Sequence, residues 1–343
     1  MQLKISNDTP TDINLWNKLC EENGNLVQST HFDKLTYYPS KKVFFEVYID
    51  NILIGGVKFS LWETKKFKII TAWLNKSLTQ FGEFVINDEM IIPKVRKFLL
   101  NNLKAFLIQE KIICYTVNGY YGNTKLLLDL EQKPDKFTEF NVAYIDLLNT
   151  ENELWNNIHS KHKNVIRKAI NNNVKISVEN EFDDFYKLLV ETYSSQNKLP
   201  PNKYYLNDLF VQLQSFTKIY FAKHNNAFLS SSLINYYGSV AYYSFSGTIK
   251  NGIGASNYLQ WFVIQDLKNN NCSRYILGQV AKDTTDTNNI KFNVGISKYK
   301  KRFGCQEMAS FKKSYVLHKF KNNIWNFLLN ILIYFRNNKK TFL

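Results

Sequence analysis

The alternation of apolar and polar positions along the chain predicts two α/β patterns in succession, the first ending before residue 131. Residues 43–49 and 52–61 alternate as strands, and Asp50-Asn51 between them is typical of a tight hairpin turn. Residues 93–109 carry apolar side chains at helical spacing, which predicts an amphipathic helix. The remaining expected elements of this pattern are a short helix over 15–20 and strands over 68–73 and 112–117.

A similar order of elements returns in the second half of the chain. Residues 219–223, 228–236 and 240–246 predict an antiparallel meander, and a loop, a helix over 258–269 and a strand over 274–277 follow it as a βαβ unit. Before the meander, the pattern predicts helices over 154–171, 182–193 and 204–213 and a strand over 174–178. The recurrence predicts a tandem repeat of one α/β fold, with the charged residues 131–139 as the linker.

Length and composition limit the class of protein. The 343 residues are enough for two domains, and 45% hydrophobic residues supply a core for each. A mean hydropathy of −0.32 and a polar start without an apolar run favour a cytoplasmic protein. Four scattered cysteines and five unpaired histidines predict neither disulfides nor a metal site. The net charge of +15 favours an anionic partner, although a Lys- and Asn-rich composition also explains part of it.

The βαβ unit offers a candidate site for an anion. Lys250, Gly252, Gly254 and Ala255 belong to the loop before the expected helix, and free backbone N–H groups at a helix start attract phosphates. A pyrophosphate-carrying donor would suit such a terminus. A flexible turn explains the glycines equally well, so both interpretations stay open.

Several short segments resemble FemABX-like proteins, a group of GNAT-like acyltransferases. One is the signature Tyr299-Lys300-x-x-Phe303-Gly304, and the others lie at Trp16, at Gln28-Ser29-Thr30 and within residues 154–174, 199–206 and 255–261. Their joint order and spacing carry the resemblance, not any single motif. The resemblance keeps its order over roughly residues 10–315. It implies an α/β protein of two tandem GNAT-like domains, with mixed sheets flanked by helices and a C-terminal helix. The predicted boundaries are 1–139, 140–320 with the donor loop, and a basic amphipathic tail over 321–343.

The resemblance also implies a reaction. Its members transfer an acyl or aminoacyl group to an amine of a cell-envelope precursor, either a surface-polysaccharide sugar or a muropeptide. The donor would be acyl-CoA or aminoacyl-tRNA, with no tightly bound cofactor, and the acceptor would be nucleotide- or lipid-linked. The alternative is a non-catalytic GNAT-like module that binds tRNA, nucleotide or membrane.

Candidate site residues follow from the same resemblance. Lys300 would face the reaction site and stabilise a phosphate or an oxyanion, while Tyr299 would flank the donor. The candidates for the acceptor or its phosphates are Arg167, Lys163, Lys203, Glu83 and Asp88. A solvated charged face and turn residues are the competing interpretations of this last set.

The C-terminal tail differs from the rest of the chain. Residues 311–343 carry seven Lys or Arg and no Asp or Glu. The apolar stretch 324–335 is too short to span a bilayer. Residues 324–340 are therefore expected either to lie on the inner face of the plasma membrane or to dock on the protein's own core.

Overall fold

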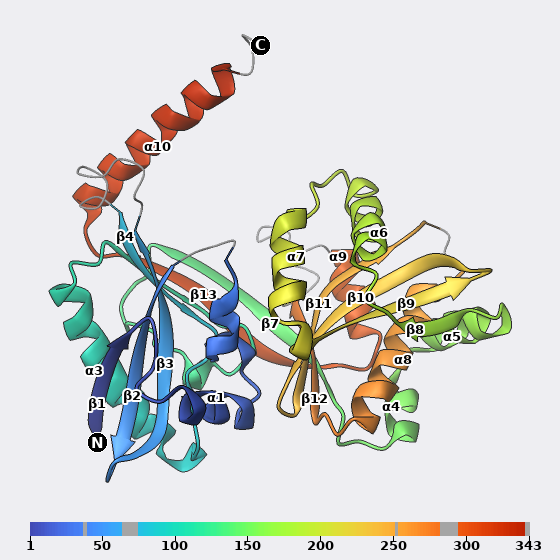
Figure 1. Ribbon diagram of the computed structural model, residues 1–343, viewed down its shortest axis with the longest axis horizontal. Coiled ribbons are helices and arrows are strands. Elements are labelled where there is room, and N and C mark those ends of the chain that lie inside the picture. Colours follow the sequence, from blue (N-terminus) through green and yellow to red (C-terminus); the bar gives the residue numbers. More distant parts are fainter. Residues whose placement is uncertain (37–39, 64–74, 251–252, 282–293, 340–343) are drawn as a thin grey trace.

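The computed structural model describes residues 1–36, 40–63, 75–250, 253–281 and 294–339, with side chains as far as Ile331. Two halves lie side by side and share one mixed sheet of 13 strands (Figure 1). Its strands follow the order β1-β2-β3-β4-β6-β13-β7-β12-β11-β10-β9-β8, and β5 pairs with β3. The predicted strand over 68–73 lies outside the described residues.

In the N-terminal half the sheet packs against one long helix, α3. Asp50 and Asn51 both have positive φ, 49° and 64°, which confirms the predicted hairpin turn. The bounds are β1 (Gln2–Asn7), α1 (Ile13–Glu22), β2 (Lys41–Ile49), β3 (Ile52–Glu63), β4 (Lys76–Phe81), β5 (Val85–Ile86), α3 (Ile92–Gln109) and β6 (Cys114–Asn118), with short 3₁₀ turns η1 (Leu26–Gln28), η2 (Thr30–Lys34), η3 (Glu89–Ile91) and η4 (Thr124–Leu126).

The C-terminal half repeats that order. Its antiparallel meander and the following βαβ unit are confirmed, since β9, β10 and β11 pair antiparallel and β11 pairs parallel with β12. The bounds are β7 (Lys136–Asp146), α4 (Glu151–Asn157), α5 (Ser160–Asn171), β8 (Lys175–Val178), α6 (Phe182–Ser194), α7 (Lys203–Gln212), η5 (Gln214–Phe216), β9 (Thr217–His224), β10 (Ala227–Tyr237), β11 (Val240–Thr248), α8 (Ala255–Asn269), β12 (Arg274–Val280), α9 (Val294–Lys301), β13 (Gln306–Val316) and α10 (Lys319–Lys339).

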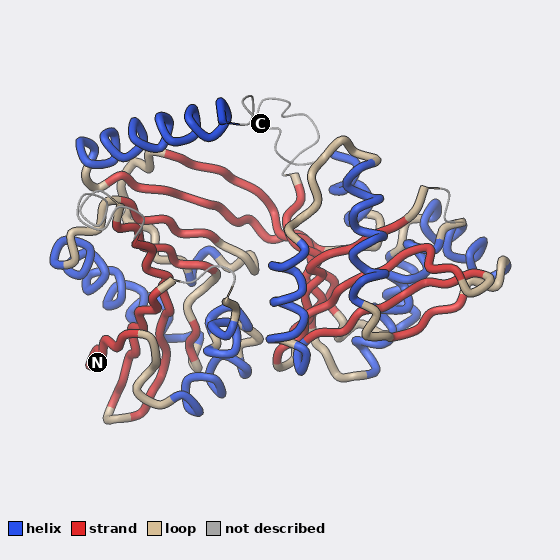
Figure 2. The backbone as a smooth tube through the Cα atoms, turned by 45° about the horizontal axis from the view of Figure 1, so that its top comes forward, coloured by secondary structure: helices blue, strands red, loops and turns tan. Residues whose placement is uncertain are grey.

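The repeat is visible in the topology. In one half β4 and β6 pair in parallel around α3, and in the other β11 and β12 pair in parallel around α8. The strand that follows each parallel pair in the chain adds to the other pair. β7, which follows β6 in the chain, pairs with β12, whereas β13, which follows β12, pairs with β6. β7 and β13 also pair with each other and run between the halves (Figure 2).

Two sequence predictions need correction. Residues 136–139 are the start of β7 and not linker, so the predicted boundary at 139/140 falls inside a continuous strand. The predicted helix over 154–171 is two helices, α4 and α5. Ile158 is extended, with ψ at 131°, and the His159 side chain accepts a hydrogen bond from the backbone N–H of Lys161 to begin α5.

The core continues from one half into the other. Trp16, Leu26 and Phe44 of the N-terminal half pack in one cluster with Phe185, Leu206 and Leu233 of the C-terminal half. Large buried aromatic side chains fix the relative position of packed elements, because they leave no room for sliding. The interface between the two halves is therefore part of the hydrophobic core.

Candidate active site

The parallel strands β11 and β12 separate partway along their length. Their ladder ends at Tyr242 and Ile276, although β11 continues to Thr248 and β12 to Val280. At the same point the pairing of β12 with β7 shifts register, and Gly278 takes a φ of +84° that favours glycine. The separation leaves a cavity of about 410 Å³, lined by Tyr120, Lys198, Tyr243, Ser244, Leu277, Gly278, Gln279, Ile296, Ser297 and Lys300.

Lys300 points from α9 into this cavity. Its Nζ donates a hydrogen bond to the Gln279 carbonyl oxygen at 3.2 Å and lies 6.0 Å from the centre of the Tyr243 ring. The described part of the chain gives this ammonium no carboxylate partner. Burial lowers the pKa of Lys300 from 10.5 to about 8, so the group is still mostly charged near neutral pH.

Tyr299, the residue before Lys300, makes its contacts outside this cavity. Its hydroxyl donates to the Ser256 carbonyl oxygen at 3.1 Å in the first turn of α8, and its ring packs against His162 and Phe303. His162 lies 3.1 Å from the Tyr299 carbonyl oxygen, and burial lowers the pKa of that histidine to about 4. Tyr299 therefore joins α9 to α5 and to the start of α8, and its predicted contact with a donor remains a prediction.

The start of α8 is shaped by its contact with α5. Gly254 caps the helix with a φ of +81°, and an added Cβ would lie 2.6 Å from Val165 Cγ1. Ala255 behind it is buried. Lys250 is exposed, and Gly252 lies outside the described residues. Close packing thus accounts for Gly254, and anion binding by this loop remains a prediction.

The predicted acceptor-binding cations lie apart from the Lys300 cavity. Arg167 and Lys163 both lie over the Trp155 ring, at 5.6 Å and 5.9 Å from its centre, and Lys163 also donates to the Asn156 carbonyl oxygen. Lys203 forms an ion pair of 2.7 Å with Asp183. None of the three lines the cavity, so their roles in acceptor binding also remain predictions.

The carboxylates of both acidic candidates accept hydrogen bonds from backbone N–H groups. Glu83 is buried, and its carboxylate accepts hydrogen bonds from the backbone N–H groups of Tyr121, Gly122 and Asn123. Burial raises its pKa to about 7 in spite of these donors. Asp88 caps a 3₁₀ turn by accepting from the Met90 N–H at 2.8 Å. An acceptor amine at Glu83 would have to displace those backbone donors.

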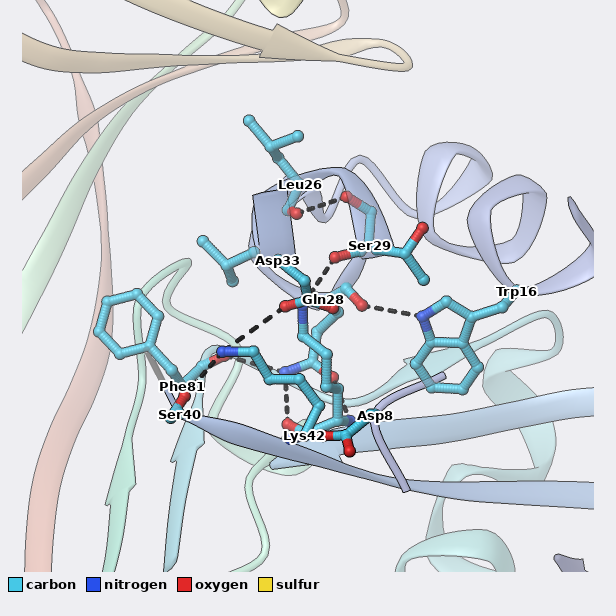
Figure 3. Close-up of polar contacts among 12 residues, drawn as sticks. Asp8, Trp16, Leu26, Gln28, Ser29, Asp33, Ser40, Lys42 and Phe81 are labelled. Atoms are coloured by element: carbon cyan, nitrogen blue, oxygen red, sulfur yellow. Dashed lines mark hydrogen bonds and ion pairs between the residues drawn. The ribbon is translucent and has the colours of Figure 1, made fainter. Parts of the chain in front are cut away.

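A second hollow, in the N-terminal half, was not predicted. It encloses about 220 Å³, and we call it the Lys58 pocket. Lys58 is only 5% exposed and donates to the Ser29 carbonyl oxygen at 2.6 Å and to Asp33 Oδ1 at 2.7 Å. Lys42 donates to Ser40 Oγ at 2.7 Å and lies 3.7 Å from the same Asp33 oxygen. Figure 3 shows Asp33, Ser40 and Lys42 beside Gln28.

The Lys58 pocket is both cationic and aromatic. Two lysines share one carboxylate, and burial lowers the pKa of each ammonium. Aromatic side chains complete the lining, namely Phe32, Trp62, Phe81 and Tyr205. Lys58 lies between the apolar residues Val57 and Phe59. This is the one signal in the sequence that points to the pocket, because a cation buried in an apolar strand needs a partner.

A smaller hollow of about 100 Å³ joins the two sites. It shares Phe32, Phe81 and Tyr205 with the Lys58 pocket, and Tyr120 and Ser244 with the Lys300 cavity. The three hollows therefore form one row across the two halves, which we call the groove. Tyr205 comes from α7, and α7 is tied to the N-terminal half where Asp208 accepts hydrogen bonds from the Thr36 N–H and hydroxyl.

The chain is similar to known proteins in its structure. No family model matches the chain, and no curated protein sequence matches it. A crystal structure of FemX is similar over 96% of this chain and 99% of its own, with a TM-score of 0.72 and 13% identity. L-PGS from Bacillus licheniformis matches with a TM-score of 0.55 and 13% identity, covering 90% of this chain and 94% of its own.

A third similar structure is the C-terminal domain of a putative lysylphosphatidylglycerol synthetase from Agrobacterium fabrum. Its TM-score is 0.54 at 7% identity, over 91% of this chain and 94% of that one. At such identities the likeness establishes the fold. The chain has the fold of FemX, with an α/β pattern that occurs twice along the chain, as the sequence predicted.

Within the described ranges, no group of three or more His, Cys, Asp or Glu side chains is placed to hold a metal ion. Likewise, none of the helices in the part of the chain that the structure describes has the length and apolar character needed to cross a membrane.

Proposed function

We propose that this protein is an acyltransferase that passes an acyl or aminoacyl group to an amine of a cell-envelope precursor. The observation that carries the proposal is Lys300. It is a half-buried ammonium without a carboxylate partner in the described chain, and it lies where β11 and β12 separate, at one end of the groove. The FemABX-like fold supports the same class of reaction.

The proposed chemistry needs only groups that the substrates and the cavity supply. The acceptor amine attacks the donor carbonyl carbon, a C–N bond forms, and the carbonyl oxygen becomes an oxyanion. When the carbonyl forms again, the C–S bond of a thioester or the C–O bond of an ester breaks. The leaving sulfur or oxygen then takes the proton that the amine loses. A fixed ammonium beside the oxyanion lowers the barrier, because it stabilises charge that exists only during the reaction.

The Lys58 pocket would bind the acceptor at the other end of the groove. Its two ammonium groups exceed its one carboxylate by one charge, and Lys42 is the less completely paired of the two. That charge suits a phosphate of a nucleotide- or lipid-linked precursor, and the aromatic lining suits a ring next to it. The groove would then lead the acceptor amine toward Lys300.

The donor would enter from the start of α8. This helix has no acidic residue in its first turn, and Arg167 and Lys163 lie on the neighbouring helix α5. Acyl-CoA and aminoacyl-tRNA both carry the phosphates that such a region favours. The name of the similar lysylphosphatidylglycerol synthetase refers to an aminoacylated lipid, which supports an aminoacyl donor and a lipid-linked acceptor. Both donors are cytoplasmic, so we place the reaction there.

The test is transfer by the purified full chain, with acetyl-CoA and aminoacyl-tRNA supplied separately. Nucleotide- and lipid-linked amino sugars and muropeptides serve as acceptors. Lys42→Ala should raise the acceptor KM about tenfold or more, the scale on which a charged hydrogen bond contributes. Lys41→Ala is the matched control, because Lys41 is exposed and pairs with Glu63 outside the pocket. Binding of tRNA or nucleotide without turnover of any donor would instead support the non-catalytic module.

A further inference from the structure

The C-terminal helix α10 lacks the packing that covers other helices of the fold. It follows β13 and extends away from the body of the molecule (Figure 1). Of its described side chains, residues 319–331, none is buried, and Phe320 and Phe327 are 73% and 65% exposed. Large apolar side chains that remain exposed on one segment indicate a surface that something else covers.

The described part of α10 has distinct faces. Phe320, Ile324, Phe327 and Ile331 recur at spacings of four, three and four residues and so share one side of the helix. Asn323, Asn326 and Asn330 follow the same spacing on another side, and all three are exposed. An apolar strip beside a polar strip is typical of a helix that lies between an apolar and an aqueous phase.

The charge of this region indicates what covers the apolar strip of α10. After Glu307 the sequence has no acidic residue, and residues 312–340 carry seven Lys or Arg. Two copies of such a helix would bring like charges together, which disfavours pairing with a second copy. An anionic lipid surface satisfies both the apolar strip and the positive charge. Lys319 and Lys321 stand directly before and after Phe320 of the apolar strip, so a membrane that covers the strip would bring headgroups close to both.

We propose that α10 lies in the interface of an anionic membrane and holds the protein at its surface. The apolar strip would enter the boundary of the acyl chains, and the asparagine strip would remain in water. This inference is independent of the transfer reaction, because no described residue of α10 lines the groove. It would place the groove near an acceptor that is itself bound to lipid.

The test is flotation of the full chain with vesicles of phosphatidylcholine alone or with phosphatidylglycerol added. Phe320→Ser/Phe327→Ser should lower binding to the anionic vesicles at least tenfold. The control Met90→Ser/Ile108→Ser removes two apolar side chains that are similarly exposed elsewhere and should bind as the wild type does. Lys319→Gln/Lys321→Gln should lower binding about fivefold for each cation, and the loss should shrink in 0.5 M salt.

Three outcomes would overturn the inference. One is equal flotation of the wild type and the Phe320→Ser/Phe327→Ser variant. Another is binding that is independent of phosphatidylglycerol and of salt. The third is a concentration-dependent dimer in light scattering that the same double variant abolishes, without any vesicle binding. Transfer to a water-soluble acceptor should be unchanged in the helix variants, so loss of membrane binding is distinguishable from failure of the transferase proposal.

Discussion

The Nζ of Lys300 lies 3.2 Å from the carbonyl oxygen of Gln279, on the part of β12 that no longer pairs with β11. The side chain is therefore fixed by a backbone acceptor that the separated strands leave available. A carbonyl oxygen orients the ammonium without neutralising it, as a carboxylate would. This arrangement keeps a positive charge directed at the cavity.

Replacing Lys300 by Ala should therefore affect turnover more than stability. We expect kcat to fall by roughly two orders of magnitude, the usual effect of removing one group that stabilises an oxyanion. Steady-state kinetics and thermal unfolding measure the two effects. Lys298→Ala is the matched control, because Lys298 is an exposed cation on the same helix. Unchanged turnover together with a lowered Tm would show that Lys300 is structural.

The pKa of Lys300 predicts the pH dependence of transfer. Because the folded value is lowered to about 8, the ammonium loses its proton as the pH rises through 8. If the charged form is required, kcat/KM should fall on the alkaline side with an apparent pKa near 8. In Lys300→Arg the guanidinium stays charged, so that alkaline fall should disappear. Activity that rises through pH 8 would indicate instead that the neutral amine acts as a base.

Gly254→Ala should destabilise the protein by about 2–3 kcal/mol. A positive φ of +81° disfavours any side chain by about 1–2 kcal/mol, and the new Cβ would also press on Val165. Chemical denaturation measures the loss. Gly295→Ala is the control, since Gly295 is an exposed helical residue where Ala should be neutral or slightly stabilising. Equal effects of the two substitutions would contradict a packing role for Gly254.

The buried pair of Lys58 and Asp33 gives a prediction about stability. Asp33→Ala leaves the ammonium of Lys58 without its carboxylate and should cost about 3 kcal/mol. Asp33→Ala/Lys58→Met should recover at least half of this loss, because the unpaired charge is then gone. The exposed pair of Lys187 and Asp184 is the control, and Asp184→Ala should cost less than about 0.5 kcal/mol. Strictly additive effects in the Asp33 and Lys58 series would contradict the coupling.

The local elements could be predicted because their signals lie within a few residues of one another. The hairpin at Asp50 and Asn51 and the helix α3 follow from turn chemistry and from apolar spacing. The candidate site could be predicted only in part. Lys300 belongs to a recognisable signature, whereas Lys58 is marked only by its apolar neighbours in β3, and its partner Asp33 comes from another element.

The sequence by itself determined the order of elements, the repeat, and the basic character of the C-terminal tail, since these depend on short-range pattern and composition. Only the tertiary structure decided that β7 pairs with β12 and β13 with β6, that β11 and β12 separate beyond Tyr242, and that the groove joins Lys58 to Lys300. The physical reason is separation along the chain. Thr116 and Ser314, which face each other across β6 and β13, are 198 residues apart. A strand of either half could satisfy the same backbone hydrogen bonds, so packing across the two halves makes the choice.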